Sequence, residues 1–129
     1  MAVTDMDQGA VAPPKSYRAH ALNLEKGLPT VEEGRRRLLE EIKRTGANGG
    51  GVLKVTHGYG SSGAGGKLRE GVRKSLLLRR KEGAIQGFVW GENWDAFDDT
   101  ARLILDRCPE LRRDPDLARG NPGITIILV

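Results

Sequence analysis

A short run of β-branched and apolar residues leads straight into a glycine-rich segment and then into a helical repeat. The run, residues 52–56 (VLKVT), is of the kind found in buried strands of parallel sheets. Beyond the glycines, Leu68, Val72 and Leu76 recur at every fourth position, which predicts an amphipathic helix. This strand-loop-helix unit limits the chain to fold classes in which strands and helices alternate.

The flanking sequence continues this alternation. Residues 18–24 suit a first strand, and a capping box formed by Thr30 and Glu33 predicts a helix over 31–44. Gly46 is placed to end this helix, and Gly83 is placed to end the helix of Leu68. Residues 84–90 predict a third strand, and residues 123–129 predict a terminal strand.

An apolar stripe between the last two strands predicts an inserted helix over 94–108 that Pro109 stops. The expected order is therefore β-α-β-α-β, the inserted helix, and β. We predict an α/β fold, an α+β two-layer sandwich in which helices pack on a four-stranded mixed sheet. The residues of the stripe are Trp94, Phe97, Ala101, Ile104, Leu105 and Cys108.

One domain suits a chain of 129 residues with 38% hydrophobic content. Residues 1–17 are expected to form a disordered tail, because they carry no periodic apolar face, and the domain then spans 18–129. With no apolar stretch of about 18 residues and no secretion signal, we expect a cytoplasmic protein that does not enter membranes. The single cysteine, Cys108, excludes an internal disulfide and is expected to be a buried apolar residue.

Charge is distributed unevenly along the chain, whose formal net charge is +4. Residues 65–81 carry seven basic residues and one acid, whereas residues 92–119 carry eight acids and five bases. A positive stripe of this density is able to attract phosphate, although charged helix faces are often only solvated.

The segment from Thr56 to Lys67 is the strongest local indication of a ligand. Glycine amides close readily around phosphate oxygens, and a helix N-terminus attracts anions. A P-loop would need Ser or Thr where Leu68 stands, and the remaining chain is too short for a dinucleotide fold. The predicted phosphate-binding residues are Gly58, Tyr59, Gly60, Ser61, Ser62, Gly63, Gly65, Gly66, Lys67, Arg69, Arg73 and Lys74.

Four short segments carry a resemblance to a known family: residues 22–27 (LNLEKG), 31–33 (VEE), 56–60 (THGYG) and 122–126 (PGITI). Over about residues 18–129 the chain resembles the Smr (small MutS-related) domain. This resemblance implies the two-layer fold seen in the C-terminal domain of a translation initiation factor, and binding or nicking of DNA or RNA. The His-Gly-x-Gly motif is matched from His57. In the family's Leu-Asp-Leu-His-Gly motif, however, Asn23 and Glu25 replace the acid and the imidazole, so the resemblance implies binding with weak or no cleavage.

The roles of individual residues stay open at this point. His57 is the candidate general acid or base of a nuclease, with Glu25 to orient it or to hold a metal. Alternatively, His57 hydrogen-bonds a phosphate, caps the loop, or is structural. Tyr59 either stacks on a base or covers the sheet edge. No metal site is predicted, and Mg²⁺ or Mn²⁺ would be needed only by a nuclease.

The sequence thus favours a nucleic-acid-binding domain for DNA or RNA that contacts backbone phosphates. The alternative is a non-catalytic adaptor. In it, the inserted acidic helix binds a protein partner and the glycine loop holds only a small phosphate ligand.

Overall fold

The computed structural model describes residues 17–27, 29–59 and 64–129. The predicted tail, apart from Tyr17, lies outside these residues. The order β-α-β-α-β-α-β confirms the predicted α/β fold, with short 3-10 turns at Gly91–Asn93 and Pro109–Arg113. The elements are β2 (Ala19–Asn23), α1 (Val31–Ala47), β3 (Val52–Thr56), α2 (Ala64–Lys81), β4 (Gly87–Trp90), α3 (Asp99–Arg107) and β5 (Ile124–Leu128).

The four strands form one mixed sheet in the order β2-β3-β5-β4. β2 pairs with β3 in parallel, whereas β5 runs antiparallel to both β3 and β4. The last strand of the chain therefore lies inside the sheet, and all five of its residues are buried. This burial explains the continuous apolar sequence of β5, because a central strand covered on both faces has no polar side to expose.

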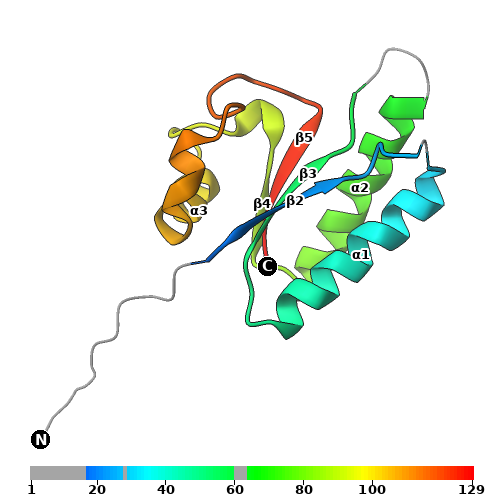
Figure 1. The fold of residues 1–129 in the computed structure, drawn as a ribbon, viewed down its shortest axis with the longest axis horizontal. Coiled ribbons are helices and arrows are strands. Elements are labelled where there is room, and N and C mark those ends of the chain that lie inside the picture. Colours follow the sequence, from blue (N-terminus) through cyan, green and yellow to red (C-terminus); the bar gives the residue numbers. More distant parts are fainter. Residues whose placement is uncertain (1–16, 28, 60–63) are drawn as a thin grey trace, which may run out of the picture.

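Helices cover both faces of the sheet. Figure 1 shows α1 and α2 on one side of the strands and α3 on the other. The predicted sandwich had two layers, and the inserted segment adds a third. Trp94, Ile104 and Leu105 of this segment pack with Ile126 and Leu128 of β5, because a bare sheet face would leave those strand residues in water.

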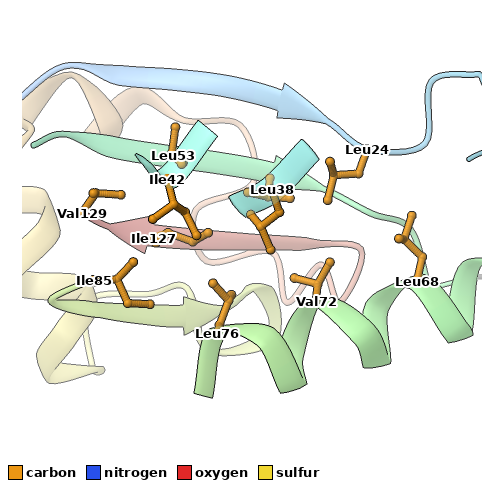
Figure 2. Close-up of a cluster of buried hydrophobic side chains, with 11 residues drawn as sticks. Leu24, Leu38, Ile42, Leu53, Leu68, Val72, Leu76, Ile85, Ile127 and Val129 are labelled. Atoms are coloured by element: carbon orange, nitrogen blue, oxygen red, sulfur yellow. The ribbon is translucent and has the colours of Figure 1, made fainter. Parts of the chain in front are cut away.

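The main core lies between the sheet and the pair α1 and α2. Leu38 and Ile42 of α1 meet Leu53 of β3 and Ile127 of β5, and Figure 2 shows them converging. Leu68, Val72 and Leu76, the repeat that predicted the second helix, point into the same core (Figure 2). The apolar periodicity of the sequence thus identified the buried face of α2.

The two core helices approach closely at glycines. A Cβ atom at Gly34 of α1 would collide with the side chain of Leu68, and one at Gly71 of α2 would collide with Val31. Arg35 of α1 donates from Nε to the Ser75 hydroxyl of α2 at 2.9 Å. The basic residues of both helices are consequently carried by one rigid layer.

Several predicted element ends were wrong. α1 continues through Gly46 to Ala47 and is capped at Asn48, and the left-handed residues that follow are Gly49 and Gly50. β4 begins at residue 87 rather than 84. α2 begins at residue 64, so that glycines assigned to the loop form its first turn. Glycine tolerates a helical conformation where the rest of the helix packs well, which a local pattern does not reveal.

The inserted helix is shorter than predicted. α3 begins only at Asp99, because the Asp98 side chain caps it by accepting the Ala101 N–H at 2.9 Å. Trp94 precedes the helix and is fully buried, whereas Phe97, predicted to share its apolar stripe, is 92% exposed. Cys108 is buried as predicted, and its burial, with Glu110 beside it, raises the pKa of the thiol to about 11. Among the helices that the structure describes, none combines the length and the apolar character needed to cross a membrane.

Candidate functional site

The loop that follows β3 is tied to the start of β5. The backbone N–H groups of His57 and Gly58 both donate to the Gly123 carbonyl, each at 3.0 Å. Gly58 has a φ of 75°, a left-handed conformation that glycine adopts without strain. The amide of Gly58 is therefore already bonded within the chain. Gly60, Ser61, Ser62 and Gly63, which were predicted to bind phosphate, lie outside the described residues.

His57 lies beneath this loop with a side chain that is 0% exposed. Its Nδ1 lies 2.8 Å from the Gly58 carbonyl oxygen, and its Nε2 lies 2.9 Å from the Thr125 hydroxyl oxygen. Since a carbonyl only accepts, the neutral ring donates from Nδ1 and accepts the Thr125 hydroxyl proton at Nε2. Burial lowers the pKa of His57, and the nearby positive charges of Arg73 and Arg69 lower it further. This geometry favours the loop-capping interpretation of His57.

Glu25 follows β2 and reaches the same loop. Its backbone N–H donates to the Asn23 side-chain oxygen at 2.9 Å, so Asn23 serves as a turn residue. The Glu25 carboxylate lies against Gly58, where a Cβ atom would collide with it. Both ring nitrogens of His57 bond elsewhere, so Glu25 does not orient the imidazole, which was one of the two roles predicted for it in a nuclease.

A metal site would need several ligating side chains close together. Across residues 17–27, 29–59 and 64–129, no three His, Cys, Asp or Glu side chains are grouped so that they would hold an ion. Among the described residues, Glu25 is the only acidic one in the depression that Thr56, Tyr59 and Asn121 line beside the loop. Of the described residues, this depression therefore contributes a single carboxylate.

The N-terminus of α2 contains three of the predicted phosphate ligands. Gly65, Gly66 and Lys67 belong to its first turn, which contains no acidic residue. The first N–H groups of any helix lack partners within the helix, and together they attract negative charge. Tyr59, just before the undescribed stretch, is 56% exposed, and its ring contacts Gly123. Both interpretations of Tyr59 remain compatible with this position.

Arg73 is engaged within the protein. Its NH2 group donates to both carboxylate oxygens of Glu92, at 2.6 and 2.8 Å, and its guanidinium lies 4.5 Å from the centroid of the Trp90 ring. Burial acts to raise the pKa of Glu92, but the hydrogen bond from Arg73 and the charges of Arg73 and Arg69 leave it lowered. Glu92 therefore occupies, as a carboxylate, the place where a phosphate would meet Arg73.

The outer face of α2 carries three lysines at intervals of seven residues: Lys67, Lys74 and Lys81. All three are exposed. Residues seven apart lie nearly on one line of an α-helix, and fourteen residues rise about 21 Å. We call this line the lysine stripe. It contains two predicted phosphate ligands, Lys67 and Lys74, whereas Arg69 and Arg73 lie nearer to Glu92 and His57.

The basic residues of the chain are concentrated in the layer of α1 and α2. α1 and α2 together contain twelve basic and five acidic residues, a net charge of +7, whereas the remainder of the chain carries nine basic and twelve acidic residues. Sequence reasoning gave a phosphate-binding role to bases of α2 but gave none to those of α1. The missed residues are Arg35, Arg36, Arg37, Lys43 and Arg44, and the signal for them was the basic run 35–37.

Comparisons of the chain with protein-family models, with curated proteins and with solved structures found no match. The resemblance to the Smr domain therefore stays a prediction from the motifs alone.

Proposed function

We propose that this chain is an Smr-like nucleic-acid-binding domain that contacts the phosphate backbone of DNA or RNA through the lysine stripe. The observation that carries the proposal is the concentration of positive charge: the layer of α1 and α2 has a net charge of +7 in a chain of net charge +4. Exposed lysines on a rigid layer provide affinity that does not depend on base sequence.

The edge of this layer adds a second kind of contact. The first turn of α2 is free of acidic residues, and the half-exposed Tyr59 precedes it in the chain. Phosphate groups near the end of the stripe would meet amides that have no partner within the helix, and a flipped base would find an aromatic ring. The ligand would thus run along α2 towards its N-terminus.

We propose that the protein binds nucleic acid, and we assign no residue to its cleavage. A general base must reach the proton that it removes, and His57 is enclosed with both ring nitrogens bonded to Gly58 and Thr125. Glu25 is exposed, and its carboxylate lies against Gly58, while both ring nitrogens of His57 are bonded to other groups. Its negative charge beside the loop would repel a phosphate rather than attract it.

Binding should be strongly salt-dependent and should be found with unrelated sequences. We expect the logarithm of the association constant to fall linearly with the logarithm of salt concentration, because each phosphate contact releases a counterion. Fluorescence anisotropy with labelled single-stranded, duplex and branched DNA and RNA measures both the slope and the preferred structure. Absence of binding to every one of these probes at low salt would refute the proposal.

Glu92→Gln is expected to tighten binding about threefold to tenfold at low salt. The substitution removes the carboxylate that holds Arg73, so that the guanidinium becomes free to contact a phosphate. Asp106→Asn is the matched control, since it removes one negative charge from the exposed face of α3. If both variants bind equally tightly, net charge rather than the release of Arg73 explains the gain, and Glu92 has no specific role.

A further inference from the structure

The depression beside the loop that follows β3 has a chemistry that phosphate binding does not explain. Its volume is about 470 Å³, and none of its described residues is a lysine or an arginine. Glu25 provides a carboxylate, and Tyr59 provides an aromatic ring. A carboxylate without a neighbouring base repels phosphate. This depression is therefore suited to a part of the ligand that carries no negative charge.

Two glycines bring the carboxylate and the ring to the same place. The Gly58 N–H donates to the Gly123 carbonyl at 3.0 Å, so the two glycines lie side by side. A Cβ atom at Gly58 would collide with the Glu25 carboxylate, and a Cβ atom at Gly123 would come within 3.0 Å of the Tyr59 ring. The carboxylate and the ring thus lie against neighbouring pieces of bare backbone.

The Glu25 carboxylate is held in position without being used. The Glu25 N–H donates to the Asn23 side chain at 2.9 Å, and the Leu24 N–H donates to the Thr56 carbonyl at 2.8 Å. Within residues 17–27, 29–59 and 64–129, no salt bridge includes Glu25, and no donor bonds to its carboxylate oxygens. Among the described residues, both oxygens are therefore free to accept hydrogen bonds from a ligand.

The nucleobases differ in what they offer to a carboxylate, which only accepts hydrogen bonds. Guanine presents two donors side by side on its Watson–Crick edge, N1–H and the N2 amino group. Uracil and thymine present a single N–H between two carbonyl groups. Adenine and cytosine present an amino group beside a ring nitrogen that is itself an acceptor. Guanine is thus the base whose Watson–Crick edge bonds both carboxylate oxygens at once.

We propose that the depression binds one unpaired guanine of the nucleic acid. Glu25 accepts from N1–H and from the N2 amino group, and the Tyr59 ring contacts the face of the base. This inference deepens the proposed function and rests on it, because the lysine stripe holds the backbone while the depression selects one base. β3 leads into α2, so the depression and the start of the stripe lie at the same end of the molecule (Figure 1).

The test compares short single-stranded probes that differ only at one central base: guanine, adenine, or hypoxanthine, which lacks the N2 amino group. In anisotropy titrations, the wild type should bind the guanine probe roughly tenfold more tightly than the adenine probe, with the hypoxanthine probe between them. Glu25→Gln should abolish this preference, because its amide presents an N–H group to one of the two donors. Its affinity for the adenine probe should stay equal or rise, since a negative charge is removed.

Glu32→Gln is the matched control, because Glu32 is an exposed glutamate of α1 outside the depression. It should retain the preference for guanine. Equal affinity of the wild type for the guanine and adenine probes would overturn the inference while leaving the lysine stripe in place. A preference for guanine that Glu25→Gln retains would overturn it as well.

Guanosine, which carries no phosphate, tests the depression without the stripe. In an isotope-labelled chain, guanosine should shift the amide signals of Gly58 and Tyr59 more than adenosine does, and the double variant Lys67→Ala and Lys74→Ala should respond equally. A response to guanosine in a protein that binds no oligonucleotide would refute the proposed function and support the guanine site. Equal responses to the two nucleosides would refute the guanine site itself.

Discussion

Replacing Lys67 and Lys74 with alanine is expected to weaken nucleic-acid binding roughly 10-fold to 100-fold at low salt, by a similar factor for every sequence. Both side chains are exposed on one line of α2, about 10 Å apart, and neither supports the core. Each lost phosphate contact should also reduce the slope of the salt dependence by about one, so the double variant should lose about two. Anisotropy titrations of labelled probes measure both quantities.

The matched control is the pair Arg113→Ala and Arg119→Ala. These arginines are exposed in the segments between α3 and β5, outside the helical layer of α1 and α2, and their removal changes the net charge equally. The control should retain most of the affinity of the wild type. Equal losses in the two pairs would mean that the protein attracts nucleic acid only through its overall charge, and the lysine stripe would lose its assigned role.

His57→Ala is expected to lower the free energy of unfolding by about 3 kcal/mol. The substitution opens a cavity beneath the loop and removes the partner of the Gly58 carbonyl and of the Thr125 hydroxyl. Urea denaturation at pH 7.5 measures this loss, and His57→Gln, which retains polar atoms, should lose less. A His57→Ala protein of unchanged stability that lost a nicking activity of the wild type would instead establish the catalytic interpretation.

The same histidine should make stability depend on pH. Burial lowers the pKa of His57 in the folded protein, whereas the unfolded chain titrates near its ordinary pKa of about 6.5. Below about pH 6.5 the unfolded state therefore takes up a proton that the folded state refuses. The stabilisation is complete above that pH and is lost as the pH falls towards the lower, folded pKa.

Parallel denaturation series from pH 7.5 to pH 5 would isolate this contribution. The wild type should lose more stability over this range than His57→Gln does, because the variant lacks the buried imidazole. His20, on the exposed side of β2, is present in both proteins and cancels in the comparison. Parallel curves for the two proteins would show that burial of His57 does not control its protonation.

Local patterns were sufficient for most of the fold. The capping box of Thr30 and Glu33 starts α1 where expected. The buried strand predicted at residues 52–56 begins and ends at the predicted residues. Local patterns failed at the start of α3, where the apolar spacing and a capping residue give different boundaries. Phe97 fits the apolar stripe by its spacing, yet the Asp98 cap starts α3 after it and leaves the ring in water.

The candidate site also has features that the sequence indicates and features that only the folded chain creates. The motif that begins at His57 and the basic helix after it could be recognised from sequence spacing alone, because clustered glycines and clustered charges are visible in a short stretch of sequence. The hydrogen-bond partners of these residues could not be recognised from the sequence. Glu92 lies 19 residues from Arg73, and Thr125 lies 68 residues from His57, so only the folded chain brings each pair together.

The sequence by itself determined which segments form strands and helices and which face of α2 is buried, since side-chain periodicity and capping act over a few residues. Only the tertiary structure decided that β5 enters the middle of the sheet, that α1 joins α2 in one basic layer, and that His57 is enclosed. Lys54 illustrates the reason. A lysine in a buried strand is unfavourable in isolation, and Asp114 and Asp116 stabilise it at 2.6 Å after a return of about sixty residues. Such pairings depend on the path of the whole chain, which no local pattern encodes.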